Sequence, residues 1–153
     1  MHIKYQDLPA LAGQEIGVSE WVLIDQERVD RFAEATGDFQ WIHVDVERAT
    51  RERGGTVAHG YLTLSLVPGL IEKLLTYEDV SHTINYGADR LRFTAPVPVG
   101  KRVRIRKVIK TVEPRAGGLQ YLAEITVEIE DEEKPALVMA MRMLVFPAEA
   151  DAA

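Results

Sequence analysis

The second half of the chain alternates apolar and polar residues with a period of two. From Thr83 onward, apolar side chains occupy every second position of 102–106 and 119–129, and most of the residues between them are polar, among them arginines in the first segment and glutamates in the second. This pattern is typical of antiparallel strands that bury one face. We therefore expect four or so long strands, with the arginines of 102–106 facing glutamates across the outer surface. Each such pair contributes about 0.2–1 kcal/mol.

One strand candidate departs from this alternation. Residues 137–146 are apolar on both faces apart from Arg142, as in strands that are covered on both sides. We expect this segment to lie centrally in the sheet with its outer face covered, and a second subunit is one candidate cover. Because exposed sheet edges are commonly closed by dimerisation, we also expect a homodimer.

An uncharged stretch, 60–71, precedes the strands and carries apolar residues on every side of a helical wheel. A helix that is apolar all round is buried. A continuous strand is the alternative, but leucine outnumbers β-branched residues here, which favours a helix. Pro68 removes one backbone hydrogen bond, so we expect a kink at this position.

The first sixty residues predict one strand and two helices. A strand is expected around 16–23, followed by a helix that Asp25 caps and Gly37 ends. The charged segment 45–53 is typical of a solvated surface helix closed by glycines. The order of elements favours an α+β fold, a single hot-dog domain in which a curved antiparallel β-sheet wraps a long buried helix. We expect this domain to span residues 1–147, followed by a frayed tail at 148–153.

Composition narrows the class of protein. Of the 153 residues, 46% are hydrophobic and 27% are charged, values typical of one globular domain. The net charge of −6 disfavours a nucleic-acid binder, which needs cationic side chains against phosphate. The chain has no cysteine, and no segment approaches the roughly 20 apolar residues that span a bilayer. We expect a cytoplasmic protein that binds neither nucleic acid nor membrane.

Two short motifs carry the candidate chemistry. The first holds Asp38 and His43 five positions apart across an aromatic turn, a spacing that can direct a carboxylate and an imidazole toward one group. The second is Ala58-His59-Gly60, where the Gly60 N–H begins the uncharged helix and has no partner within it. The alternatives are that Asp38 is a turn residue, that His43 is structural, and that His59 caps the helix or orients the loop.

Two further patterns suggest other sites. His43, Asp45 and His59 have the composition of a two-histidine, one-carboxylate iron site. We disfavour it, because the histidines would have to converge across a charged segment and Asp38 would have no role. The basic run 101–107 alternates with apolar residues, which favours a solvated strand face over a phosphate-binding strip.

A third motif, Arg90-Leu91-Arg92-Phe93-Thr94-Ala95-Pro96-Val97, completes a resemblance to the MaoC-like dehydratases, which include the (R)-specific enoyl-CoA hydratases. The resemblance covers roughly residues 19–112, and the branch it is most similar to is that of nodulation protein N. There is one departure, since the family's usual Asp-x-Asn-Pro-x-His is Asp38-Phe39-Gln40-Trp41-Ile42-His43 here. The spacing is kept, and the change bears on pocket width and preferred acyl chain.

The resemblance implies a hot-dog hydratase that adds water to a trans-2-enoyl-CoA, giving an (R)-3-hydroxyacyl-CoA, or that catalyses the reverse dehydration. The substrate would be an acyl-CoA or an acyl carrier protein thioester, and the reaction would need no cofactor or metal ion. The site residues then expected are Asp38 and His43 as the catalytic pair, Gly60 as the oxyanion donor, and His59, Gln40 and Arg92 as substrate contacts.

Two other functions stay open, because one fold hosts several. A carboxylate-activated water could attack the thioester carbonyl, which would make the chain a hot-dog thioesterase. A protein of this fold without turnover would only bind acyl thioesters, with Trp41 narrowing the pocket. The intact Asp38 and His43 disfavour this last function.

Overall fold

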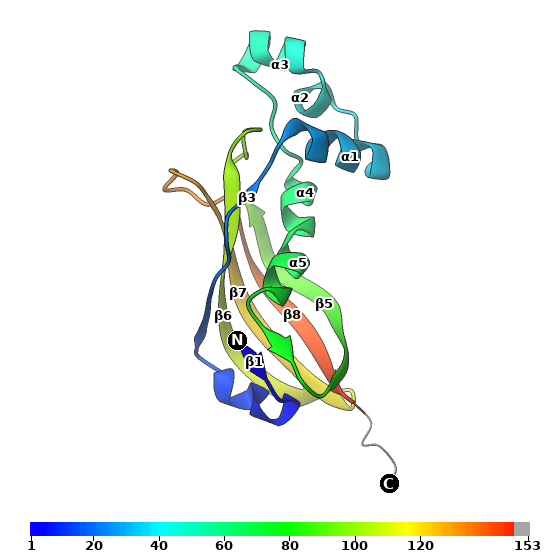
Figure 1. Cartoon of the computed structure of the whole chain (residues 1–153), viewed down its shortest axis with the longest axis vertical. Helices are drawn as coiled ribbons and strands as arrows, with labels where there is room; N and C mark the ends of the chain where they lie inside the picture. The colour runs from blue at the N-terminus through cyan, green and yellow to red at the C-terminus, as the bar shows by residue number, and fades with distance from the viewer. Residues whose placement is uncertain (149–153) are drawn as a thin grey trace.

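A curved antiparallel sheet with helices along its concave side forms most of the molecule (Figure 1). The computed structural model describes residues 1–148. The four long strands confirm the expectation from the period-two pattern, and they are β5 (Val80–Phe93), β6 (Arg102–Arg115), β7 (Gly118–Ile129) and β8 (Leu137–Pro147). The order in the main sheet is β2-β6-β7-β8-β5, with β3 also pairing with β6. The short strands are β1 (His2–Ile3), β2 (Glu15–Val18), β3 (Val22–Leu23) and β4 (Thr76–Tyr77), of which β1 and β4 pair separately.

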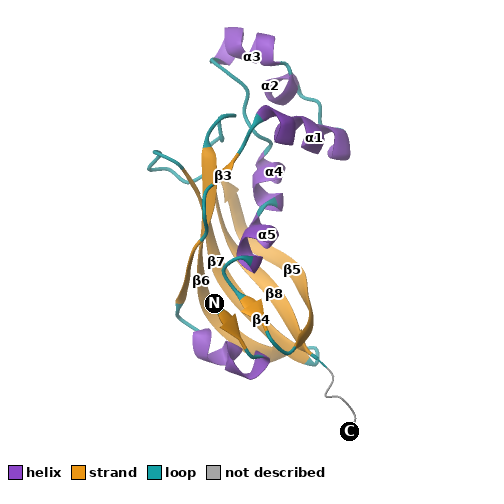
Figure 2. Ribbon diagram, viewed as in Figure 1, coloured by secondary structure: helices purple, strands orange, loops and turns teal. Residues whose placement is uncertain are grey.

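The helices form two groups (Figure 2). Two of them, α4 (Gly60–Ser65) and α5 (Val67–Glu72), run along the sheet. Three others gather beyond one end of it, and they are α1 (Gln26–Thr36), α2 (Trp41–Val44) and α3 (Val46–Arg53). The 3-10 helix η1 (Tyr5–Leu11) contacts β6. Within residues 1–148, no helix has the length and apolar character needed to cross a membrane.

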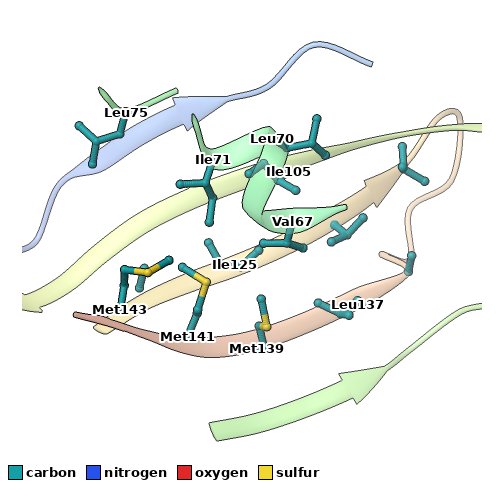
Figure 3. Close-up of a cluster of buried hydrophobic side chains, with 14 of the residues drawn as sticks. Val67, Leu70, Ile71, Leu75, Ile105, Ile125, Leu137, Met139, Met141 and Met143 are labelled. Carbon is teal, nitrogen blue, oxygen red and sulfur yellow. The ribbon is translucent and has the colours of Figure 1, made fainter. Parts of the chain in front are cut away.

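The core lies between α5 and the inner face of the sheet (Figure 3). Along β7 and β8, nearly every second residue is buried, as the alternation predicts. Each fully buried aliphatic side chain contributes about 1.5–3 kcal/mol relative to an exposed one. The side chains labelled in the figure are Val67, Leu70, Ile71, Leu75, Ile105, Ile125, Leu137, Met139, Met141 and Met143.

The uncharged stretch forms two helices instead of one. The break falls at Leu66, two residues before Pro68, whose missing N–H leaves the Leu64 carbonyl without its helical donor. The expectation that this stretch is buried on all sides is wrong, because Tyr61 is 67% exposed and Ser65 and Pro68 are also exposed. The sheet covers one side of the helix pair, and a groove opens between the pair and the strands β5 and β8, at the β5 edge of the sheet.

The predicted strand at 16–23 is interrupted between β2 and β3. The cause lies at Ser19, whose N–H donates to the Ile105 carbonyl at 2.9 Å and whose hydroxyl accepts from the Ile105 N–H at 3.0 Å. The side-chain oxygen of Ser19 therefore takes a bond that a backbone carbonyl would accept in a regular ladder. Two short strands result where the sequence predicts one.

Opposite charges line the outer face of the sheet, as predicted. Arg104 and Arg106 both donate to Glu128, at 2.6 and 3.0 Å, and Arg102 donates to Glu130 at 2.7 Å. Exposed pairs of this kind contribute about 0.2–1 kcal/mol each, less than one buried leucine. These pairs therefore define the solvated face more than they stabilise the fold.

Lys107 contradicts the expected solvated face of 101–107. Its side chain points inward and is fully buried, and its Nζ donates to the Tyr121 hydroxyl at 2.9 Å. The position follows from the strand period, since Ile105 and Ile109 on either side are buried on the same face. A buried amine whose only described hydrogen-bond partner is a phenol is costly to charge, so burial lowers the pKa of Lys107 to about 7.

The last strand, β8, confirms its predicted central place between β7 and β5. Its outer face is half-buried at Val138, Ala140 and Arg142 in the single chain. Ala148, the first residue of the predicted tail, donates its N–H to the Asp79 carbonyl at 2.9 Å. The rest of that predicted tail, 149–153, lies outside the described residues.

Candidate active site

Asp38 follows directly on the end of α1. The helix begins at its predicted cap, where the Asp25 carboxylate accepts from the Arg28 N–H at 2.9 Å, and it ends at Gly37, which adopts a φ of 77°. A left-handed residue there turns the chain sharply, and glycine adopts this conformation without strain. The exposed Asp38 side chain is thereby placed at the start of a new turn.

His43 lies on the short helix α2 and is only 7% exposed. Its Nδ1 lies 2.6 Å from the Val57 carbonyl, so Nδ1 carries the proton and Nε2 is the free, basic nitrogen of the neutral ring. Burial lowers the pKa of His43 below 6.5, against the raising effect of the Val57 hydrogen bond, and nearby His59 and Arg53 lower it further. His43 is therefore a neutral base near pH 7.

His59 joins this pair from the residue before α4. Its ring stacks on His43 with centroids 3.9 Å apart and an angle of 28° between the planes. Its Nε2 lies 3.0 Å from the Asp38 backbone carbonyl, so Nε2 is the protonated nitrogen. One side-chain oxygen or nitrogen from each of Asp38, His43 and His59 lies within 4.8 Å of the other two. The structure thus brings the two sequence motifs together.

A pocket of about 310 Å³ opens beside His43. Gly60 lines it at the first position of α4, where a backbone N–H has no partner within its own helix. A methyl group on Gly60 would come within 3.0 Å of the Phe93 ring, so glycine keeps this wall open. The other lining residues are Ile42, Arg53, Val57, Ala58, Thr63, Thr94, Ala95, Pro96, Val97 and Ala136.

Gln26 ties the surrounding segments together. Its side-chain amide donates to the His43 carbonyl at 2.7 Å and to Asp30 at 2.8 Å, and its side-chain oxygen accepts from the Thr56 hydroxyl at 2.6 Å. These bonds connect α1, α2 and the loop before α4. No residue pattern points to this role of Gln26. None points to Arg53 as a pocket residue either, because the charge pattern indicates a solvated helix there.

All three of the expected substrate contacts lie outside the pocket lining. Gln40 is exposed and precedes α2, where its carbonyl accepts from the His43 N–H at 2.9 Å. The Arg92 guanidinium donates to the neighbouring Leu91 carbonyl at 2.8 Å. His59 also lies outside the lining, behind His43. The structure groups His43, Gly60 and Asp38, and contact of the other three with substrate stays a prediction.

Trp41, which replaces the proline of the family motif, does not narrow the pocket as expected. The Arg48 guanidinium lies 4.1 Å from the centre of its ring, and Trp41 is outside the pocket lining. The replacement therefore packs α2 against α3 and leaves the spacing of Asp38 and His43 intact. Pocket width is set by other residues, among them Phe93.

The iron site suggested by the sequence, with His43, Asp45 and His59 as its ligands, does not form. Asp45 caps α3 by accepting from the Arg48 N–H at 3.0 Å, and Asp38 takes its place beside the two histidines. A metal ion lies in the ring plane of each histidine ligand, whereas His43 and His59 stack face to face. Rings in this arrangement do not aim two lone pairs at one ion, so the group fits acid–base chemistry better.

A hot-dog sheet around a helix, with a carboxylate and an imidazole close together beside the pocket, fits an enzyme of the hot-dog fold that uses acid–base chemistry. Comparison with known proteins identifies the family. A family model described as "MaoC like domain" matches residues 7–131. The chain belongs to this family of MaoC-like dehydratases.

Individual relatives agree with this assignment. The chain is 50% identical over 134 residues to 3-hydroxyacyl-thioester dehydratase Z of Mycobacterium tuberculosis, covering 86% of this chain and 89% of the relative. It is 45% identical over 142 residues to nodulation protein N of Rhizobium leguminosarum bv. viciae, covering 90% and 88%. The solved monoamine oxidase regulatory protein of Archaeoglobus fulgidus superposes with a TM-score of 0.78 at 21% identity, covering 98% of both chains, which confirms the fold.

Proposed function

We propose that the chain catalyses the reversible addition of water to a trans-2-enoyl thioester, giving an (R)-3-hydroxyacyl thioester. The observation that carries this proposal is that a carboxylate oxygen of Asp38 and a ring nitrogen of His43 lie within 4.8 Å of each other, beside a pocket that His43 and Gly60 line. The thioester dehydratase among the relatives supports the substrate class. The carrier would be coenzyme A or acyl carrier protein, and we place the reaction in the cytoplasm, as the sequence predicts.

The acid–base steps follow from the tautomer of His43. A water molecule held between the Asp38 carboxylate and His43 Nε2 gives a proton to Nε2, and its oxygen bonds to C3 of the enoyl group. The pair of electrons leaving the double bond moves onto the thioester oxygen. The protonated His43 then returns its proton to C2, so that one water is added in total. Asp38 orients the water and stabilises the transient positive charge on His43.

Gly60 supplies the stabiliser for the enolate oxygen in this scheme. Its N–H lies at the positive end of α4, in the same pocket as His43. A backbone donor aimed at developing negative charge is worth roughly 2.7–4 kcal/mol in comparable sites. The same donor helps both directions, because hydration and dehydration share the enolate.

Gly60→Ala should lower kcat/KM roughly 10–100-fold, because the new methyl group displaces Phe93 and shifts the thioester away from the N–H. The measurement is steady-state kinetics together with thermal unfolding. Gly69→Ala is the matched control, since a methyl group added to that helical glycine would meet no neighbouring atom within 4 Å. Its replacement should therefore keep turnover. An unchanged kcat/KM in Gly60→Ala would remove the oxyanion assignment.

The function itself is tested with crotonyl-CoA. We expect the enoyl-thioester absorbance to fall while a thiol reagent detects no free CoA. Thiol release would instead identify a thioesterase, in which the activated water attacks the carbonyl carbon. Tight binding without either change, repeated with longer acyl chains, would identify a binding protein.

We also propose that the chain acts as a homodimer that pairs through β5. This strand ends the main sheet. Three of its apolar side chains, Ile84, Tyr86 and Phe93, are 44–51% exposed, and Tyr61 of α4 is exposed beside Phe93 at 5.7 Å between ring centres. Exposed apolar patches of this kind mark interfaces. Because Phe93 also lines the pocket, a second copy here would close the active site from solvent.

Ile84→Asp should convert the dimer into a monomer, because it places a charge in this apolar surface. The molar mass is measured by light scattering after size exclusion. Val46→Asp is the matched control, since Val46 is 50% exposed at the start of α3, away from β5, and the variant should remain a dimer. A monomeric wild-type protein at micromolar concentration would overturn the proposal.

A further inference from the structure

His59 occupies a place in the site that substrate binding does not explain. It is 2% exposed, lies outside the pocket lining, and contacts both members of the acid–base pair. We propose that His59 is the positioning residue of this site, holding the Asp38 turn through Nε2–H and the His43 ring through stacking. This role rests on the proposed function, and it is a different role from the substrate contact expected from the sequence.

The first contact fixes the Asp38 turn. The other hydrogen bonds of Asp38 are long, with its N–H 3.4 Å from the Thr36 hydroxyl and its carboxylate 3.3 Å from the Gln40 N–H. The His59 Nε2 bond to the Asp38 carbonyl is shorter, at 3.0 Å, and comes from a buried residue 21 positions away. It is therefore the contact that ties an exposed turn to the interior of the protein.

The second contact holds the His43 ring. The Val57 carbonyl anchors Nδ1 of that ring, and the face of His59 lies against it at 3.9 Å. An imidazole held both at one nitrogen and on one face cannot rotate freely, so Nε2 keeps one direction. Phe32 supports His59 in turn, with ring centres 5.0 Å apart.

One ring nitrogen of His59, Nδ1, has no hydrogen-bond partner in residues 1–148, which indicates that this imidazole does more than fill space. Because Nε2 carries the proton, Nδ1 presents a lone pair, and no hydrogen-bond partner for it exists in residues 1–148. A buried acceptor without a donor destabilises a fold, and an apolar ring of similar size would avoid that cost. The two contacts that use its N–H and its ring offset that cost.

The stack also bears on the charge of His43. Two imidazoles whose ring centres are 3.9 Å apart repel each other when both are protonated, so a proton on one ring disfavours a proton on the other. The charged groups that act on His43 are Asp38, which raises its pKa, and His59 and Arg53, which lower it. Removing His59 should therefore move the titration of His43 upward.

Two substitutions separate the contacts. His59→Phe keeps a ring against His43 and removes the donor to Asp38, while His59→Gln keeps an N–H donor and removes the ring. We expect kcat to fall roughly 10–100-fold in each, with KM little changed, and the NMR titration midpoint of His43 to rise in both. Phe146→Leu is the packing control, since Phe146 stacks on a different histidine, His82, with ring centres 4.7 Å apart. It should keep kcat because both contacts of His59 remain.

A measurement on the wild-type protein keeps the proposal testable if a variant does not fold. The ¹⁵N shifts of the neutral His59 ring should show the proton on Nε2 and a bare Nδ1. A neutral ring with its proton on Nδ1, or an unmoved His43 midpoint in both folded variants, would overturn the proposal. Because neither readout requires turnover, a protein that fails to hydrate crotonyl-CoA would contradict the proposed function and leave the positioning role to be decided separately.

Discussion

Asp38→Asn and His43→Gln are each expected to lower kcat/KM for crotonyl-CoA by roughly 10²–10⁴-fold, the usual contribution of general acid–base catalysis. Each replacement nearly keeps the side-chain volume and removes one chemical property. Asparagine cannot stabilise a protonated His43 by charge, and glutamine has no basic ring nitrogen to receive the proton of water. Both losses affect the transition state more than binding, so kcat should fall more than KM rises.

The pH dependence of the wild-type enzyme provides a second readout for His43. The reaction needs the neutral ring, and burial lowers the pKa of His43 below 6.5. The rate should therefore be retained as the pH falls to 6.5 and decline only below it. At lower pH, His43 is protonated and can no longer accept a proton from water.

Asp45→Asn is the matched control for Asp38→Asn. Asp45 belongs to the same motif, but its carboxylate caps α3 through the Arg48 N–H at 3.0 Å. Asparagine is also a good N-cap, so stability and turnover should both be kept. Equal loss of turnover in the two variants would mean that the motif is needed for folding. Retained turnover in Asp38→Asn or His43→Gln would overturn the assignment of the pair.

Much of the fold could be predicted because its determinants are local. Asp25 and Gly37 begin and end α1 through contacts within a few residues, and the period of two along 119–129 requires only that one face be buried. The errors arise where distant segments meet. Tyr61 is exposed because of where the sheet ends relative to its helix. The strand breaks at Ser19 because the Ser19 hydroxyl accepts a hydrogen bond from Ile105, 86 positions away in the sequence.

The candidate site divides in the same way. The spacing of Asp38 and His43 is local, so the sequence could indicate the pair. The stacking of His59 on His43 and the bonds of Gln26 to two other segments are tertiary contacts, to which no residue pattern points. Arg53 was missed because a charged helix is usually solvated, and only the fold places this residue at the pocket.

Lys107 illustrates a conflict between two sequence signals. Its position in the alternation of β6 places it with Ile105 and Ile109, whereas its charge and its basic neighbours suggest the outer face. The strand period decides the direction of the Lys107 side chain, because every second side chain of a paired strand points inward whatever its chemistry. The cost of burying the amine should therefore be measurable as a dependence of stability on pH.

In the wild-type protein, the free energy of unfolding should rise with pH between about 7 and 9. The pKa of Lys107 is about 7 in the folded chain against 10.5 for an ordinary lysine, so in this window the unfolded state binds one more proton than the folded state. The expected slope approaches 1.4 kcal/mol per pH unit. Burial also raises the pKa of Tyr77 to about 12 and that of Tyr121 well above 10. Above about pH 9 these phenols ionise in the unfolded state but not in the folded state, which opposes the rise, so the slope belongs to Lys107 only below that pH.

Lys107→Met should remove this slope and stabilise the protein at pH 7 by about 2–4 kcal/mol. The thioether side chain fills similar space without a proton to lose, and the Tyr121 hydroxyl gives up one hydrogen bond worth about 1 kcal/mol. Urea unfolding at a fixed protein concentration from pH 7 to pH 9 measures both effects. Lys110→Met is the control, since Lys110 is exposed and paired with Glu124, and its loss should change stability by less than about 0.5 kcal/mol. If the wild-type and Lys107→Met profiles run parallel across the window, the buried amine is not the source of the slope.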